Sequence, residues 1–192
     1  QNILIFMAFK FQRLGIKDII VIKPQSFSDD RGFFFENFKE SEFVLNGIDK
    51  KFIQDNFSHS PYGVLRGLHY QKNPKAQAKL VTVLKGKIFD VAVDIRVNSP
   101  TFGKWVGEII SDKDHESIYI PEGFAHGFCV LSDYADVLYK VNNEYSPEHQ
   151  SGIMWNDPKI KISWPIKKPI ISIKDSKLST LENMDNNFIY EN

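Results

Sequence analysis

The chain has 192 residues, and its 24 basic and 24 acidic side chains give no formal net charge at pH 7. This length predicts one domain over residues 1–192, and nothing in the balanced charge indicates non-specific binding to nucleic acid or to a membrane. The single cysteine, Cys129, excludes an intrachain disulfide. A small anionic ligand is compatible with this composition, because it needs only a few local cations.

The N-terminal stretch QNILIFMAFKFQ contains a short apolar run. It lacks the basic start and the small-residue cleavage site of a signal peptide, and no run in the chain approaches the roughly 18 apolar residues of a membrane span. We therefore expect a cytoplasmic protein with neither a membrane nor a nucleic-acid partner. We also expect Met7 to be the natural start and residues 1–6 to be upstream or added sequence.

Short segments rich in Val, Ile, Phe and Tyr follow one another along the chain, separated by Gly, Pro, Asn and Asp, which is typical of strands and turns. The predicted strand segments are 17–24, 32–38, 51–60, 63–71, 78–96, 104–110, 116–123, 125–132 and 135–146. Segment 78–96 predicts a hairpin that turns at residues 85–87. Helix signals are confined to 39–47 and 179–184. So many strands with so little helix predict an all-β fold, a cupin-like jelly-roll β-sandwich or barrel with a few short peripheral helices.

The C-terminal part of the chain is less regular. The stretch WPIKKPIIS, residues 164–172, is rich in proline and predicts an irregular segment laid over the body. Residues 183–192 are mostly polar, and we expect them to fray.

The segment GVLRGLHYQ, residues 63–71, carries an arginine and a histidine inside an apolar run. In a regular strand alternate side chains point to opposite faces, so Arg66 and His69 would face apart. A β-bulge at Gly67 would add one residue and shift that alternation, which brings both side chains to one side. The sequence therefore predicts a bulged strand that presents Arg66 and His69 to a common site.

Other segments place polar side chains on strand faces that also carry apolar residues. These are Gln54 and Asn56 in FIQDNF, Lys79 in AKLVTVL, His126 in GFAHGF, and Tyr139 and Tyr145 in DVLYKVNNEY. Any one of them is more often a packing or hydrogen-bonded structural residue than a catalytic group. Their number on separate strands favours a polar pocket inside the β-fold, because buried polar groups are otherwise costly.

The sequence lacks the motifs that would indicate a metal-dependent enzyme or one with a nucleotide cofactor. A cupin metal site needs an H-x-H pattern with a carboxylate and a later histidine, whereas the position two residues after His69 is Gln71. No G-x-G-x-x-G or P-loop pattern points to nicotinamide or ATP binding. We therefore expect chemistry without a cofactor and without a metal ion.

Seven motifs in order between Ile20 and Asp175 resemble the dTDP-4-dehydrorhamnose 3,5-epimerase family. They are DDRGFFFENF, FIQDNFSHS, GVLRGLHYQ, GKIFDVAVDIRVNSPTFGKWVGE, IPEGFAHGF, LYKVNNEYSPEHQSGIMWNDP and ISWP. The resemblance implies a jelly-roll homodimer that works without cofactor or metal. It also implies inversion of C3 and C5 of dTDP-4-dehydro-6-deoxy-D-glucose, on the way to dTDP-L-rhamnose and cell-surface polysaccharide.

The same motifs imply roles for individual residues. His69 matches the proton acceptor, Tyr139 the proton donor, and Asp175 the carboxylate partner of the histidine. Lys79 is the cation that we expect beside the enolate oxygen formed when the base removes a proton. The implied substrate-binding residues are Arg31, Phe34, Glu36, Gln54, Asp55, Asn56, Arg66, His126 and Tyr145, some of them reached from the partner subunit. Tyr145 matches the aromatic residue that stacks on thymine, and Gln150 stands where relatives often carry an acidic residue.

Three alternatives stay open beside a 3,5-epimerase. The first is a mono-epimerase that inverts only C3 or C5 of a related dTDP-4-keto-6-deoxy sugar. The second is a metal-dependent cupin enzyme, against which Gln71 speaks. The third is a non-catalytic sugar-binding jelly roll, against which His69 and Tyr139 in the register of the family speak.

Overall fold

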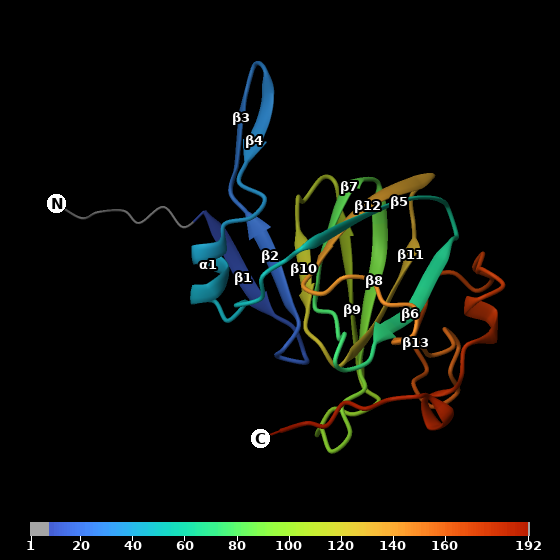
Figure 1. Ribbon diagram of the computed structural model, residues 1–192. Helices are drawn as coiled ribbons and strands as arrows, with labels where there is room; N and C mark the ends of the chain where they lie inside the picture. Colours follow the sequence, from blue (N-terminus) through green and yellow to red (C-terminus); the bar gives the residue numbers. More distant parts are fainter. Residues whose placement is uncertain (1–7, 192) are drawn as a thin grey trace.

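The computed structural model describes residues 8–191, in which two antiparallel β-sheets face each other (Figure 1). The larger sheet has the strand order β1 (Phe9–Arg13), β2 (Ile20–Pro24), β10 (Ser117–Ile120), β7 (Lys79–Lys85), β12 (Tyr134–Val141), β5 (Gln54–Pro61). The smaller sheet has the order β13 (Gln150–Gly152), β6 (Leu65–Gln71), β11 (Phe124–Val130), β8 (Lys87–Asp94), β9 (Trp105–Ser111). The predicted all-β jelly-roll fold is confirmed. The expectation for residues 1–6 falls outside the described residues.

Few elements lie outside the two sheets. The hairpin of β3 (Ser26–Asp29) and β4 (Gly32–Phe35) projects away from them (Figure 1). The helix α1 (Glu40–Leu45) confirms the helix signal in 39–47, and the 3₁₀ turns η1 (Asp175–Lys177) and η2 (Leu181–Asn183) follow near the C-terminus. No helix within residues 8–191 is long and apolar enough to cross a membrane.

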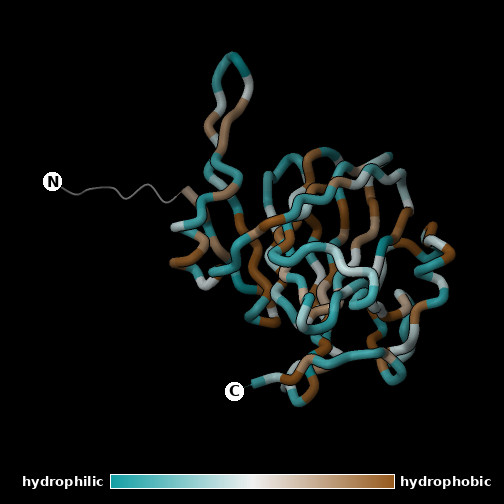
Figure 2. The backbone as a smooth tube through the Cα atoms, in the orientation of Figure 1, coloured by the Kyte–Doolittle hydropathy of each residue, from teal (hydrophilic) through white to brown (hydrophobic). Residues whose placement is uncertain are grey.

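The main apolar core fills the space between the sheets. Val81 and Val83 from the larger sheet pack in one cluster with Phe124 and Phe128 from the smaller sheet. In Figure 2 the strands of the two sheets contain many hydrophobic residues, whereas the tip of the projecting hairpin is hydrophilic. Polar side chains on the inward faces beside this core need a cavity or hydrogen-bond partners.

Both sheets are also covered from outside. Phe43 of α1 packs with Ile20 and Leu80 on the outer face of the larger sheet. The C-terminal segment covers the smaller sheet, where Phe188 is buried and Ile189 forms a β-bridge with Val97. The described part of the tail, 183–191, is therefore packed along the body instead of fraying, because Phe188 anchors it.

The turn at residues 85–87 is present, but the predicted hairpin is wrong. Gly86 has a φ of +85°, as a tight turn requires. However, β7 pairs with β10 and β12, whereas β8 pairs with β9 and β11. The turn thus carries the chain from one sheet to the other. This crossover places Lys79 and Asp90 on facing walls.

The predicted bulge in β6 is confirmed. His69 pairs with His126 and Arg66 pairs with Phe128, so three steps along β6 match two steps along β11. Gly67, inside the bulge, has a φ of +131°, and a Cβ there would lie 2.5 Å from the Cα of Gly127. Only glycine allows this close approach of the two strands. As a result, Arg66 and His69 line the same cavity.

Candidate active site

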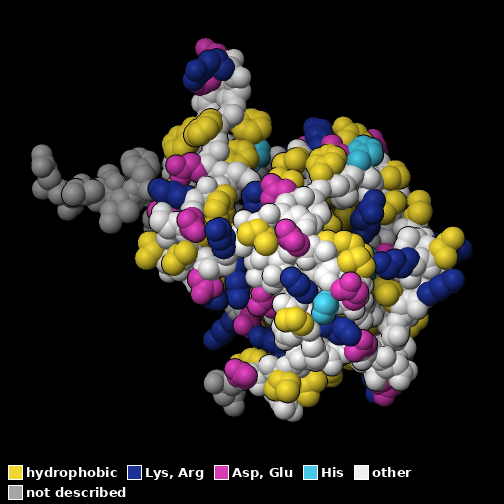
Figure 3. Space-filling model, in the orientation of Figure 1, with side chains coloured by type: hydrophobic (Ala, Val, Ile, Leu, Met, Phe, Trp, Pro, Cys, Tyr) yellow, Lys and Arg dark blue, Asp and Glu magenta, His cyan; other side chains and the backbone are white. Residues whose placement is uncertain are grey.

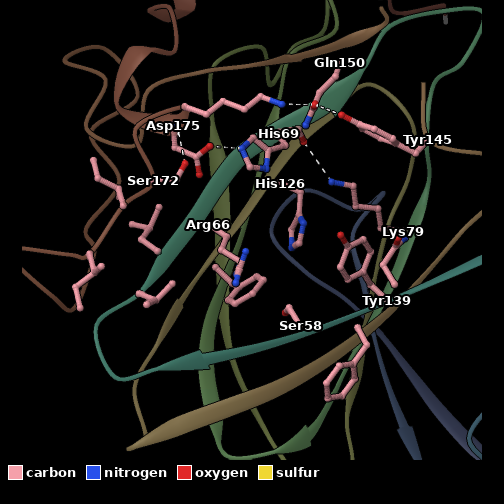
Figure 4. A pocket seen from close by; sticks show the side chains of 18 of the residues that line it. Ser58, Arg66, His69, Lys79, His126, Tyr139, Tyr145, Gln150, Ser172 and Asp175 are labelled. Carbon is pink, nitrogen blue, oxygen red and sulfur yellow. Dashed lines mark hydrogen bonds and ion pairs between the residues drawn. The ribbon is translucent and has the colours of Figure 1, made fainter. Parts of the chain in front are cut away.

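A cavity of about 760 Å³ opens between the two sheets beside the bulged strand (Figure 4). Its walls come from β5, β6, β7, β11 and β12 and from the C-terminal segment 170–175. Its volume falls within the range of small-molecule sites. Nine of the predicted site residues line it: Asp55, Asn56, Arg66, His69, Lys79, His126, Tyr139, Tyr145 and Asp175. Gln54 lines a smaller hollow that shares His69 and Lys79 with this cavity.

His69 and Asp175 form a hydrogen-bonded pair at the cavity wall. The Nε2 atom of His69 lies 2.8 Å from Oδ1 of Asp175, across more than a hundred residues of sequence. A carboxylate accepts, so the neutral imidazole carries its proton on Nε2 and keeps a free electron pair on Nδ1. The side chain of His69 is 28% exposed, whereas that of Asp175 is 7% exposed. The geometry gives a base that faces the cavity and a carboxylate buried behind it.

The carboxylate of Asp175 is kept ionised by its surroundings. Burial alone would raise its pKa. The hydrogen bond and charge of His69 act against burial, together with the backbone N–H of Gly67 and the side chain of Ser172, so the pKa of Asp175 lies below its usual value. The bulge therefore serves twice, since it turns Arg66 inward and supplies a backbone N–H to Asp175.

Lys79 is the buried cation of the cavity. It is 8% exposed, and its ammonium group donates to the backbone carbonyl of His69 at 3.3 Å. Burial lowers the pKa of Lys79 to about 8, and the charge of Asp90 partly opposes this shift. A cation held without full hydration interacts strongly with any negative charge that develops beside it.

His126 has a carboxylate partner that the sequence did not reveal. Its Nε2 atom lies 2.8 Å from Oδ2 of Asp90, which is fully buried. Oδ1 of Asp90 is buried without a hydrogen-bond partner among residues 8–191. Burial, reinforced by the charge of Lys79, lowers the pKa of His126, which is therefore neutral at pH 7. Asp90 alternates along β8 with Ile88 and Ala92, which are in the core between the sheets, and this alternation is the local signal that could have found it. Its partner His126 lies on another strand.

Tyr139 and Arg66 complete the sugar-sized end of the cavity. Tyr139 comes from β12 of the larger sheet and His69 from β6 of the smaller sheet, so they reach the cavity from opposite walls (Figure 4). Burial raises the pKa of Tyr139, although the charge of Arg66 partly opposes the shift, so the phenol stays protonated at neutral pH. The Nε of Arg66 donates to the hydroxyl of Ser60 at 3.0 Å, which orients the guanidinium.

The outer end of the cavity is bounded by Tyr145, Gln150 and Lys174. The phenol of Tyr145 donates to Oε1 of Gln150 at 2.7 Å, and the ammonium of Lys174 donates to the same oxygen at 2.5 Å. The sequence singled out Gln150 without a role and did not single out Lys174. An amide oxygen accepts both bonds without neutralising the charge of Lys174.

Three predicted binding residues do not reach this cavity within the chain. Arg31 lies at the tip of the β3–β4 hairpin, Phe34 lies on β4, and Glu36 follows it. Arg31 and Phe34 line a separate hollow on the hairpin. Figure 3 shows acidic and basic side chains at the hairpin tip and hydrophobic side chains toward its base. The Arg31 side chain is paired with Asp29 and is 90% exposed, so the hairpin presents its side chains outward.

The described residues offer few donors for a metal ion. No group of three or more His, Cys, Asp and Glu side chains with metal-binding geometry occurs in residues 8–191. The two cavity histidines each use Nε2 for a carboxylate. That chemistry proceeds without a metal or cofactor stays a prediction from the sequence.

Fold and site together define a class of protein. A jelly roll whose cavity holds a carboxylate-backed histidine, a protonated tyrosine on the opposite wall and a buried ammonium group can remove and return a proton beside a sugar carbonyl. These are the features of a carbohydrate epimerase, an isomerase.

Comparison with known proteins identifies the family. The family model described as dTDP-4-dehydrorhamnose 3,5-epimerase matches residues 13–183. The chain is 53% identical to the Shigella flexneri dTDP-4-dehydrorhamnose 3,5-epimerase over 161 residues, which cover 83% of this chain and 89% of that protein. It also resembles the crystal structure of the Legionella pneumophila dTDP-6-deoxy-D-glucose-3,5-epimerase in complex with dTDP-4-keto-L-rhamnose, with a TM-score of 0.89, 46% identity and coverage of 92% and 95%. The chain belongs to the dTDP-4-dehydrorhamnose 3,5-epimerase family.

A more distant relative has a narrower activity. The dTDP-4-dehydrorhamnose 3-epimerase of Streptomyces niveus is 38% identical over 167 residues, which cover 86% of this chain and 81% of that protein. The relatives of this chain are therefore named for double inversion and for single inversion.

Proposed function

We propose that this protein inverts C3 and C5 of dTDP-4-dehydro-6-deoxy-D-glucose and releases dTDP-4-dehydro-L-rhamnose for dTDP-L-rhamnose biosynthesis. The observation that carries the proposal is the placement of His69 and Tyr139 on opposite walls of one cavity, with Lys79 between the sheets. Inversion needs a base on one face of the sugar ring and an acid on the other. We expect this reaction in the cytoplasm and from a single domain spanning residues 1–192.

His69 acts as the base in this proposal. The protons at C3 and C5 are acidified by the neighbouring C4 carbonyl, and Nδ1 of His69 faces the cavity with a free electron pair. When Nδ1 takes the proton, the imidazole becomes a cation. The ionised Asp175 at 2.8 Å stabilises that cation and keeps the ring oriented.

Lys79 and Arg66 stabilise the enolate. Loss of the proton moves negative charge onto the C4 oxygen of the sugar, where a cation has its largest effect on the rate. Lys79 is the buried cation of the cavity, and Arg66, which lines the same cavity, is oriented by Ser60. His126, held neutral by burial and oriented by Asp90, supports binding of the sugar or diphosphate.

Tyr139 returns the proton. Its raised pKa keeps the phenol protonated at pH 7, so it can donate to the enolate carbon from the face opposite His69. The phenolate that remains is close to Arg66, whose charge stabilises it. Solvent then returns a proton to Tyr139 and takes the one held by His69, which regenerates the acid and the base. Electrons are conserved in this cycle, so it needs no redox cofactor.

The outer end of the cavity binds the nucleotide. Tyr145 has a ring about half exposed at the rim, which suits stacking on thymine. Asp55, Asn56 and Gln54 lie on the neighbouring strand β5 and offer polar groups to the base and ribose. The charge of Lys174 at the rim suits the diphosphate.

A homodimer would bring the remaining residues to the site. Arg31, Phe34 and Glu36 sit on or beside a projecting hairpin. Its aromatic residues Phe27 and Phe34 are more than half exposed, and Phe33 is also exposed although its ring packs on one side against His115. Exposed aromatic side chains of this kind favour an interface. We propose that this hairpin enters the nucleotide end of the partner's cavity.

The dimer proposal can be tested by subunit complementation. The H69A and R31A variants are each expected to have low activity, whereas a mixed dimer has one site with a native base and a native hairpin from the partner. Mixing and re-equilibrating the two variants should therefore restore activity. Failure to restore it in a demonstrated mixed dimer would contradict hairpin exchange.

The configuration of the product distinguishes inversion at both carbons from inversion at one carbon. The substrate dTDP-4-dehydro-6-deoxy-D-glucose is incubated with the protein, and proton couplings in the NMR spectrum report the configuration at C3 and C5. Inversion at both carbons supports the proposal. Inversion at C3 alone would assign the chain to the activity named for the Streptomyces niveus relative.

A further inference from the structure

The segment that carries Tyr145 is held by side chains instead of by a sheet. Residues 142–146, called the Tyr145 loop below, follow β12 and have no helix or strand. Backbone groups in such a loop need partners when they are buried. In this loop the partners at four consecutive residues are glutamine side chains.

Gln71 supplies the central contacts. Its Nε2 donates to the carbonyl of Glu144 at 3.2 Å, and its Oε1 accepts from the backbone N–H of Ser146 at 2.8 Å. These two bonds bracket Tyr145. A third bond, from Nε2 to the carbonyl of Lys75 at 2.7 Å, ties the same side chain to the loop before β7. Gln71 itself is 3% exposed, and its three bonds are part-buried.

Two further glutamines complete the arrangement. Gln54 accepts from the backbone N–H of Tyr145 at 2.9 Å, and Gln77 donates to the carbonyl of Asn143 at 2.7 Å. The backbone of the Tyr145 loop is thereby fixed from β5, from β6 and from the segment before β7. The ring of Tyr145 is 51% exposed, so its place depends largely on this backbone frame and on the bond of its phenol to Gln150.

Gln71 also lies on the strand that carries the base. It follows His69 by two residues on β6, and both side chains line the same small hollow. One buried amide therefore links the strand with His69 to the loop with Tyr145. A dTDP-sugar spans these two points as one molecule, so their separation must match the length of the substrate.

We infer that Gln71 is a positioning residue for nucleotide binding, which sets the place of the Tyr145 ring relative to His69. This inference rests on the proposed stacking of Tyr145 on thymine. Gln71 acts through the loop backbone, because its three bonds all go to backbone groups. Its effect should therefore appear in the affinity for dTDP and should require the Tyr145 ring.

A double-mutant cycle tests this coupling. The variants are Gln71→Met, Tyr145→Ala and the double variant, and the probe is dTDP, with its Kd measured by calorimetry. In the native background Q71M should weaken dTDP binding about tenfold, because three backbone groups lose their side-chain partner and the loop shifts. In the Y145A background the same substitution should change the Kd by less than about twofold. The kcat of Q71M at saturating substrate should stay within about threefold of the native value.

Two results would overturn the inference. An unchanged Kd in folded Q71M, or an equal loss of affinity in both backgrounds, would show that Gln71 does not act through Tyr145. If Y145A itself leaves the Kd unchanged, the stacking role proposed for Tyr145 fails first, and the two failures are thereby distinguished.

A second variant and a control keep the test decisive. Gln71→Glu retains an acceptor for Ser146 N–H and loses the two donated bonds, so it should weaken dTDP in the same background-dependent way. It replaces Q71M in the cycle if Q71M does not fold. Gln12→Met changes an exposed glutamine on β1 and should leave the Kd unchanged.

Discussion

The two ends of the cavity are held in place by different chemistry. At the sugar end, buried carboxylates orient the histidines: Asp175 binds His69 and Asp90 binds His126, each at 2.8 Å. At the nucleotide end, amide side chains hold the loop of Tyr145. A carboxylate fixes both the tautomer and the charge of its partner, whereas an amide fixes position alone.

This difference indicates a division of work. Groups whose protonation state is set by buried charge should control the rate of proton transfer. Groups that are positioned by neutral hydrogen bonds should control how tightly the nucleotide is held. Substitutions at the two ends should therefore separate kcat from the Kd of dTDP.

The largest effect is expected from His69→Ala. Removing the base should lower kcat on the order of 10²–10⁴-fold. The Kd of dTDP should change little, because the nucleotide end is untouched. Conversion of substrate followed by NMR gives kcat, and calorimetry gives the Kd.

His59→Ala is a matched control for that variant. His59 also pairs with an aspartate, since its Nδ1 lies 2.6 Å from Oδ1 of Asp136, but this pair is on the outer face of the larger sheet and His59 is exposed. It should keep native activity. A similar loss in H59A and H69A would indicate a general effect of losing a His–Asp pair.

Lys79→Met should be the next most damaging change. The variant keeps the length of the side chain and removes the cation beside the enolate, so we expect a loss of kcat on the order of 10²–10³-fold. Lys85→Met, at the exposed far end of the same strand, where Lys85 pairs with Asp112, is the matched control. Near-native kcat in folded K79M would remove Lys79 from the mechanism.

Tyr145→Ala should change the Kd of dTDP instead of kcat. Loss of a stacked ring should weaken the binding of dTDP about 5- to 100-fold. The kcat at saturating substrate should stay within about threefold of the native value. Tyr134→Ala removes a partly exposed tyrosine from the start of β12, outside the cavity, and should change neither quantity. If Y145A lowers kcat and leaves the Kd unchanged, the proposed division between the two ends is wrong.

The smallest expected effect is a decline of kcat/KM at alkaline pH. Burial lowers the pKa of Lys79 to about 8, so Lys79 is cationic below that pH and neutral above it. Because the cation is the active form, kcat/KM should fall about tenfold for each pH unit above 8. The residual activity of K79M should lack this decline. The same decline in K79M would assign it to another group.

The sequence predicted the catalytic residues at the sugar end of the site better than the residues that hold them in place. Strand alternation and Gly67 led to the bulge and to a common cavity for Arg66 and His69, because both features are local in the chain. Motif register added Asp175, which no local pattern could connect to His69. The pairing of Asp90 with His126 was missed, since two strands must first be placed side by side.

Two errors have the same physical origin. The turn at Gly86 looks the same whether its strands pair with each other or cross between sheets, so its local signal could not exclude the crossover. The C-terminal tail is polar on average, and a single buried residue, Phe188, is enough to hold it. The glutamine contacts of the Tyr145 loop also depend on tertiary placement, and the sequence around Gln71 indicated only that a metal-binding histidine is missing there.

The central claim is that His69 exchanges the protons at C3 and C5 of the sugar with solvent. The most direct measurement is incubation of dTDP-4-dehydro-6-deoxy-D-glucose with the protein in D₂O, with NMR observation of both carbons. Native protein should place deuterium at C3 and at C5, and H69A should place it at neither within the same time. No incorporation by the native protein, or equal incorporation by H69A, would contradict the account.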